Sequence, residues 1–225
     1  MPKLNFSQSD TFVQNPELGK GKKSDGNHSF EKNLWRDFKS GSEDALMELY
    51  NLYSDKLFNY GTQITYDKEL IRDVVQDVFL YLVQNKKSIK QPDSIKFYLF
   101  ACFRRRLMKV LKRNKKISYS EDFERGDGFQ ITVEEGIKSI DTQFTLETKK
   151  MLEMASKKLP AKQREIIMLH YFEGLSYKEI ADMMGFGHVR SARNLLYKAV
   201  NGLSSILKKY HGDLFVLIGL LFYSF

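Results

Sequence analysis

One face of a predicted helix near the carboxyl end of the chain carries side chains that can read DNA bases. On a helical wheel advancing about 100° per residue, the apolar residues of this segment cluster around Ala192. The polar residues gather at or beside the opposite pole: Arg190, Arg193, Asn194, Tyr197, Lys198 and Asn201. Arginine can bond guanine in two places and asparagine can do the same with adenine, whereas lysine and tyrosine more often hold phosphates. On an isolated helix this polar face would simply be solvated. Whether it binds DNA therefore depends on the segments around the helix.

The segment before that helix has the signature of a helix-turn-helix. SYKE at 176–179 is a capping-box pattern, with Ser176 at the cap and Glu179 three residues later. The apolar face of this short helix is predicted to be Ile180, Ala181 and Met184, and residues 185–187 read as a tight turn. This context favours an interpretation in which the polar face of the final helix binds the major groove of DNA, rather than one in which it only faces solvent. The predicted contacts are Ser176, Tyr177, His188, Arg190, Ser191, Arg193, Asn194, Tyr197 and Lys198.

A second group of charged and aromatic residues lies on a helix predicted over 94–116. This segment holds nine Lys or Arg residues and no acid. Cations attract phosphates, and aromatic faces can stack on unpaired bases. Phe103 is assigned to the core, while a core role and a DNA role stay open for the other aromatics, and a membrane-surface helix is a further alternative. The candidate DNA contacts are Lys96, Phe97, Tyr98, Phe100, Arg104, Arg105, Lys109, Lys112 and Arg113.

A third group lies on the preceding predicted helix and consists of Asp73, Gln76, Asp77, Phe79 and Leu80. Asp73 and Asp77 are four residues apart, so they share one helix face. Chemistry alone does not distinguish a partner-binding surface from a solvated acidic face here.

The elements that must position these groups are all predicted to be helices. Apolar residues recur at spacings of three and four along 46–57, 70–82, 95–110 and 192–207. Ser42, followed by two acids, is predicted to cap the first strong helix. The fold class is therefore all-α, with two small helical domains at 29–116 and 148–210. Residues 1–28 form a predicted flexible arm, residues 117–147 a flexible linker with eight acids against two bases, and residues 211–225 an apolar tail.

Composition argues against an enzyme. There is no phosphate-cradling glycine loop, no triad spacing among the four histidines and no Cys/His cluster with metal-ligand spacing, so no cofactor, metal or small-molecule substrate is expected. The net charge of +8 favours polyanionic partners. The tail LFVLIGLLFYSF is shorter than the roughly 20 residues that span a bilayer. A cytoplasmic protein is expected, with peripheral membrane contact through the tail as the alternative.

Together these motifs resemble those of an extracytoplasmic-function (ECF) RNA polymerase sigma factor, most like the Bacteroidetes type. The segment from Ala45 to Lys86 is similar to conserved region two and contains the family's DxxQxxF pattern as Asp73, Gln76 and Phe79. SIKFYLFACFRRRLMKVLKR is similar to the helix that melts and reads the −10 element. LPAKQREIIMLHYFEGLSYKEIADMMG matches region four. Tyr98 stands where the family often has tryptophan, and Arg105 where it often has asparagine.

The resemblance implies a role for each group. The acidic helix would dock on core RNA polymerase, the basic helix and the loop from Lys86 to Asp93 would capture −10 bases, and the final helix would enter the −35 major groove of promoter DNA. It also implies an anti-sigma partner, often membrane-bound. The alternatives are a stand-alone helix-turn-helix regulator that binds an operator and a membrane-surface adaptor.

Overall fold

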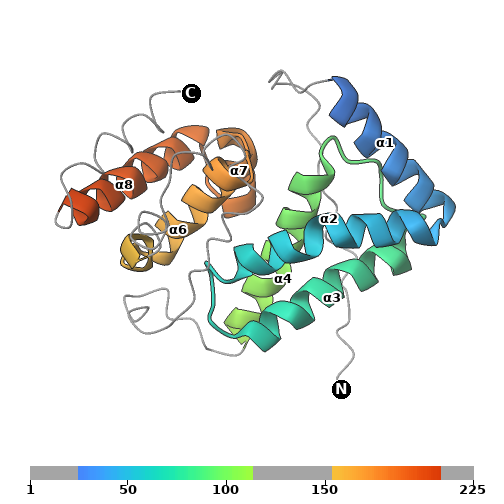
Figure 1. The fold of residues 1–225 in the computed structure, drawn as a ribbon, viewed down its shortest axis with the longest axis horizontal. Helices are drawn as coiled ribbons and strands as arrows, with labels where there is room; N and C mark the ends of the chain where they lie inside the picture. Colours follow the sequence, from blue (N-terminus) through green and yellow to red (C-terminus); the bar gives the residue numbers. More distant parts are fainter. Residues whose placement is uncertain (1–24, 114–153, 209–225) are drawn as a thin grey trace.

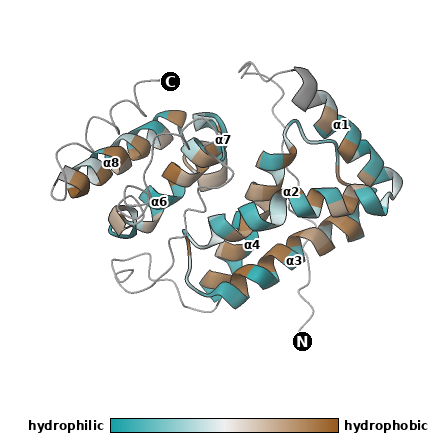
Figure 2. Ribbon diagram, viewed as in Figure 1, coloured by the Kyte–Doolittle hydropathy of each residue, from teal (hydrophilic) through white to brown (hydrophobic). Residues whose placement is uncertain are grey.

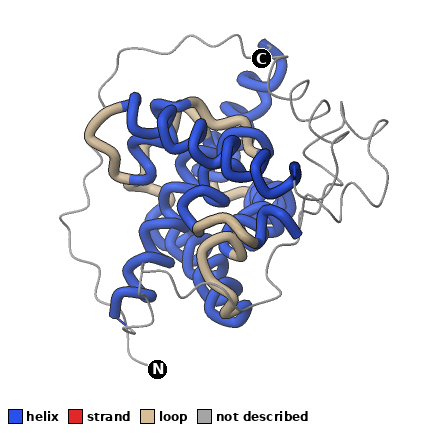
Figure 3. Tube along the Cα trace, turned by 90° about the vertical axis from the view of Figure 1, so that its left-hand side faces the viewer, coloured by secondary structure: helices blue, strands red, loops and turns tan. Residues whose placement is uncertain are grey.

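The computed structural model describes residues 25–113 and 154–208. The helices are α1 (Asp25–Ser40), α2 (Glu43–Gly61), α3 (Lys68–Asn85), α4 (Ile95–Arg113), α6 (Ala161–Ile167), the π-helix η1 (Met168–Phe172), α7 (Tyr177–Met184) and α8 (Val189–Lys208) (Figure 1). The described residues contain no strand, which confirms the all-α fold (Figure 3). Helix α1 begins before residue 28, the predicted end of the arm. The predicted linker and apolar tail, and residues 1–24 of the arm, lie outside the described residues.

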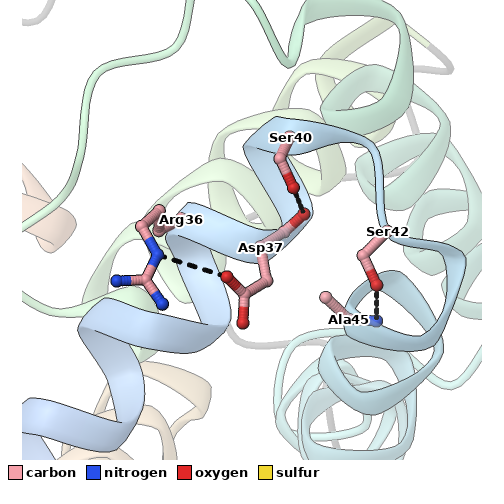
Figure 4. A network of polar contacts seen from close by, with 5 residues as sticks. All are labelled: Arg36, Asp37, Ser40, Ser42 and Ala45. Carbon is pink, nitrogen blue, oxygen red and sulfur yellow. Dashed lines mark hydrogen bonds and ion pairs between the residues drawn. The ribbon is translucent and has the colours of Figure 1, made fainter.

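Capping side chains set several helix boundaries. The Ser42 hydroxyl accepts from the Ala45 amide at 3.2 Å, as predicted, and the Asp67 carboxylate accepts from the Leu70 amide at 3.0 Å. Each cap satisfies an amide that has no partner within its own helix. At the corner between α1 and α2, the Ser40 hydroxyl donates to the Asp37 carbonyl at 2.7 Å (Figure 4). Gly41 has φ = +103° there, a backbone conformation that would be strained in a residue with a side chain.

Helices α1–α4 form the amino-terminal bundle around one apolar core. Trp35, Tyr60 and Phe103 are among its fully buried side chains. Gly61, at the end of α2, lets α3 and α4 approach closely: a Cβ there would lie 2.7 Å from Cγ2 of Ile71 and 2.9 Å from Cζ of Phe103. Both distances are shorter than real contacts allow, so the absence of a side chain at Gly61 is a packing requirement.

Helices α6–α8 form the carboxyl-terminal bundle, in which α6 and α7 both pack against α8. Figure 2 shows hydrophobic and hydrophilic stripes alternating along α8. The predicted apolar face of α8 is confirmed, because the following residues are buried: Ala192, Leu196, Ala199, Leu203 and Leu207. On α7 the prediction was partly wrong. Met183 is buried at 8% exposure, whereas Met184 is only half-buried, because α7 also contacts α4 of the other bundle.

The two bundles lie side by side, with α7 next to α4 (Figure 1). No helix within residues 25–113 and 154–208 is both long and apolar enough to cross a membrane.

We expect Gly61→Ala to lower the free energy of unfolding by about 1–3 kcal/mol, because the added methyl group overpacks a filled core. Chemical denaturation followed by circular dichroism would measure the change. Gly187→Ala is the matched control, since a Cβ at Gly187 meets nothing within 4 Å and the residue has no positive φ. Equal stabilities of the two variants would contradict the close approach at Gly61.

Candidate nucleic-acid interface

The outer face of α8 is open to solvent. Of the nine contacts predicted for the helix-turn-helix, seven are exposed on α8 and the turn before it: His188, Arg190, Ser191, Arg193, Asn194, Tyr197 and Lys198. The turn is closed by Gly185, whose φ of +73° ends α7 in the left-handed conformation. This geometry brings the predicted groove-reading residues together on one side of one helix.

The other two predicted contacts lie at the start of α7. The Ser176 hydroxyl accepts from the Glu179 amide at 3.2 Å and donates to its carboxylate at 2.7 Å, which confirms the capping box. This hydroxyl is therefore occupied in holding the start of α7. Tyr177 is half-buried, and its ring stacks on His170 with centroids 4.7 Å apart and an interplanar angle of 24°. The guanidinium of Arg193 lies 5.4 Å from the Tyr177 ring centroid. Sequence reasoning did not single out His170.

The nine candidates on α4 divide by exposure. Four cations are exposed: Arg105, Lys109, Lys112 and Arg113. Lys96, Phe97, Tyr98 and Arg104 are half-buried. The Tyr98 ring packs edge-on against Trp35, with centroids 5.8 Å apart, and burial raises the pKa of its hydroxyl above the usual value. The prediction of a DNA contact for Phe100 was wrong for this structure. Its side chain is fully buried, with the ring centroid 5.3 Å from that of Tyr60, so no base can reach it.

Arg104 lies in the interface between the two bundles. Its Nε donates to the carboxylate of Glu165 at 2.6 Å, and its Nη1 donates to the carbonyl of Met183 at 3.1 Å. The same Glu165 oxygen accepts from the hydroxyl of Tyr60 at 2.6 Å. The Glu165 side chain is only 3% exposed. A buried carboxylate needs such partners, and here both come from the other bundle.

Lys96 makes the second charged contact between the bundles. Its Nζ donates to the carbonyl of Glu173 at 3.0 Å and lies 3.6 Å from the carboxylate of the same residue. Burial raises the pKa of the Glu173 carboxyl, while the positive charges of Lys96 and Lys56 partly offset that rise. Sequence reasoning missed Glu165 and Glu173, because neither belongs to a charge pattern on its own helix.

A partly open pocket of about 380 Å³ lies at the edge of this interface, between α4 and α7. Its walls include the cations Arg105, Lys109 and Lys112, the apolar side chains of Phe97 and Met108, and the acid Asp182. The packing between α4 and α7 is therefore incomplete at this edge.

The predicted group of residues on α3 forms a surface that contains both acidic and apolar side chains. Asp73 and Gln76 are exposed, Asp77 is half-buried, and burial raises the pKa of the Asp77 carboxyl, an effect that nearby Arg106 partly offsets. Leu80 is 54% exposed on the same side of the helix. Direct contact by Phe79 was predicted wrongly: it is 6% exposed and supports the surface from beneath, with its ring centroid 4.9 Å from that of Tyr50.

The α3 surface extends to exposed apolar residues that sequence reasoning missed. These are Met47 and Tyr50 on α2, at 62% and 43% exposure, and Val83 on α3, at 39%. Spacings of three and four along α3 place residues 73, 76, 80 and 83 on one stripe. We call this acidic and apolar area the α2–α3 surface. Exposed apolar side chains gathered beside acids are typical of a protein-binding surface. The only available sequence signal was a run of apolar residues on the side of α3 opposite its core.

Comparisons with known proteins agree on one family. Residues 149–201 match the family Sigma-70, region 4. The RNA polymerase sigma factor YlaC of Bacillus subtilis is 24% identical over 143 residues, which are 64% of this chain and 81% of YlaC. The ECF RNA polymerase sigma factor SigM of the same organism is 25% identical over 167 residues, 74% of this chain and 97% of SigM.

Solved structures share the fold. The sigma factor RpoE from Bartonella quintana, in complex with the anti-sigma factor NepR, matches with a TM-score of 0.53 and 21% identity over 76% of this chain and 100% of that one. CnrH in complex with the cytosolic domain of CnrY matches with a TM-score of 0.52 and 16% identity over 80% of this chain and 99% of that one.

Proposed function

We propose that this chain acts as an ECF sigma factor that directs RNA polymerase to promoters, and that three of its surfaces divide this task. The exposed face of α8 would read the −35 element, the basic helix α4 would hold the −10 region, and the α2–α3 surface would bind the polymerase. The observation that carries the proposal is the α8 face, where the predicted base-reading residues lie together on a capped helix-turn-helix.

The −35 assignment follows from the geometry of α8. Arg193 and Asn194 are exposed on its outer face, and their side chains match the donor and acceptor patterns of guanine and adenine in the major groove. Tyr197 and Lys198 lie one turn further on and suit phosphate contacts. The short helix α7 then crosses near the DNA backbone, as the first helix of such a motif does.

The −10 assignment combines charge with a fixed loop. The exposed cations Arg105, Lys109 and Lys112 on α4 would track the phosphates of the separated strands. We assign a flipped base to the loop from Lys86 to Asp93. This loop is held in place, since Lys39 donates to the Ile89 carbonyl at 2.8 Å and Ile89 is buried at 8% exposure. A fixed loop loses little entropy when it takes up a base.

The α2–α3 surface is proposed to dock on core RNA polymerase. Acids beside exposed apolar residues suit a basic and apolar partner helix, and acids facing the polymerase are kept away from the phosphates of the promoter. The sigma factor itself carries out no covalent step in this proposal, since the polymerase makes the RNA chain. We also propose an anti-sigma partner, because RpoE is solved in complex with the anti-sigma factor NepR. We propose a cytoplasmic location, because all of these roles are exercised on the polymerase and its promoter DNA.

Two pairs of substitutions test the division. Asp73→Asn with Gln76→Ala is expected to weaken binding to core polymerase by about tenfold or more. Substituting important interface residues costs upward of about 1.4 kcal/mol of binding free energy. Arg193→Ala with Asn194→Ala is expected to leave that binding intact and to reduce transcription from −35-dependent promoters by about tenfold or more. Polymerase affinity and run-off transcription measure the two effects.

The matched controls are Asp37→Asn and Arg36→Ala, which change the same charges on α1 at an exposed pair 3.2 Å apart. Both should behave like the wild type. Identical losses of both activities in both double variants would contradict the division. Tight, polymerase-independent binding of a dimer to a palindrome would favour the stand-alone regulator instead.

A further inference from the structure

A stack of side chains from three elements ends at one of the residues proposed to read DNA. His170 of η1 stacks on Tyr177 of α7, and the guanidinium of Arg193 of α8 lies 5.4 Å from the Tyr177 ring centroid. This distance and partner suit a cation–π contact. The stack therefore links a half-buried part of the carboxyl-terminal bundle to an exposed arginine on the α8 face.

The π-helix fixes the base of the stack. Residues 168–172 depart from α-helical spacing, and the Glu173 amide donates to the Met168 carbonyl at 3.0 Å to close the wider turn. The Nδ1 atom of His170 lies 3.0 Å from the Leu175 carbonyl, in hydrogen-bonding contact, and the Tyr171 ring packs edge-on against His170 with centroids 5.0 Å apart. π-turns of this kind often occur at functional sites. The His170 ring is thus held from two sides.

We propose that His170 is a positioning residue for promoter recognition. By holding the Tyr177 ring flat, it limits the directions in which Arg193 can point, so that less side-chain entropy is lost when the arginine meets its base. The inference rests on the proposed role of α8 at the −35 element. It predicts an effect on sequence discrimination from a residue that is itself half-buried and outside the helix-turn-helix.

The test uses the full chain with core polymerase on two promoters that differ only in the −35 element. His170→Ala is expected to reduce discrimination between them about 2- to 5-fold, the size of an exposed cation–π contact, and His170→Phe is expected to restore it. The double variant with Arg193→Ala should be no worse than Arg193→Ala alone. A promoter that needs no −35 element reports basal activity, which should not change.

Additive losses in the double variant, or failure of phenylalanine to rescue, would overturn the role of His170 while leaving the −35 assignment in place. If Arg193→Ala itself does not alter discrimination, the assignment of Arg193 fails and the positioning role fails with it.

Discussion

The buried carboxylate of Glu165 is the constraint on which the relation between the two bundles depends. A charge so far from water must be matched by donors, and it receives hydrogen bonds from Tyr60 at the end of α2 and from Arg104 on α4. Tyr60 precedes Gly61, whose missing side chain lets α2 close onto α3 and α4. The position of Tyr60 is thus tied to the close packing at Gly61 in the amino-terminal bundle. A second contact from Arg104 to the Met183 carbonyl ties α7 to the same point.

Helix α4 consequently has two faces with different surroundings. One face fills the core of its own bundle through residues such as Leu99, Phe103 and Leu107, which are fully buried. The other presents cations, some to solvent and some to the carboxyl-terminal bundle. The α8 face, by contrast, is exposed in the same arrangement. The structure therefore leaves the proposed −35 surface on α8 exposed, whereas Arg104 and Lys96 of the proposed −10 surface on α4 contact the carboxyl-terminal bundle.

Rules for helix capping and helical periodicity predicted many of the helix boundaries and buried faces from the sequence, because these features depend on residues close together along the chain. The caps at Ser42 and Ser176 and the apolar face of α8 follow from hydrogen-bonding and helical periodicity. Periodicity, however, says which side of a helix is apolar and not what covers it. Phe100 lies beside the main stripe of α4 and is buried because Tyr60 packs on it, and Met183 is buried because α4 lies against α7. Glu165 and His170 gain their roles from residues distant in sequence or from a π-turn, so no spacing rule pointed to them.

Transcription in vitro with purified core RNA polymerase, with and without this chain, on a library of genomic promoters tests the central claim most directly. The account predicts start sites that appear only when the chain is present and that share two upstream elements at a fixed spacing. A core enzyme that is active with another sigma factor, but neither binds this chain nor starts transcription with it, would contradict the account.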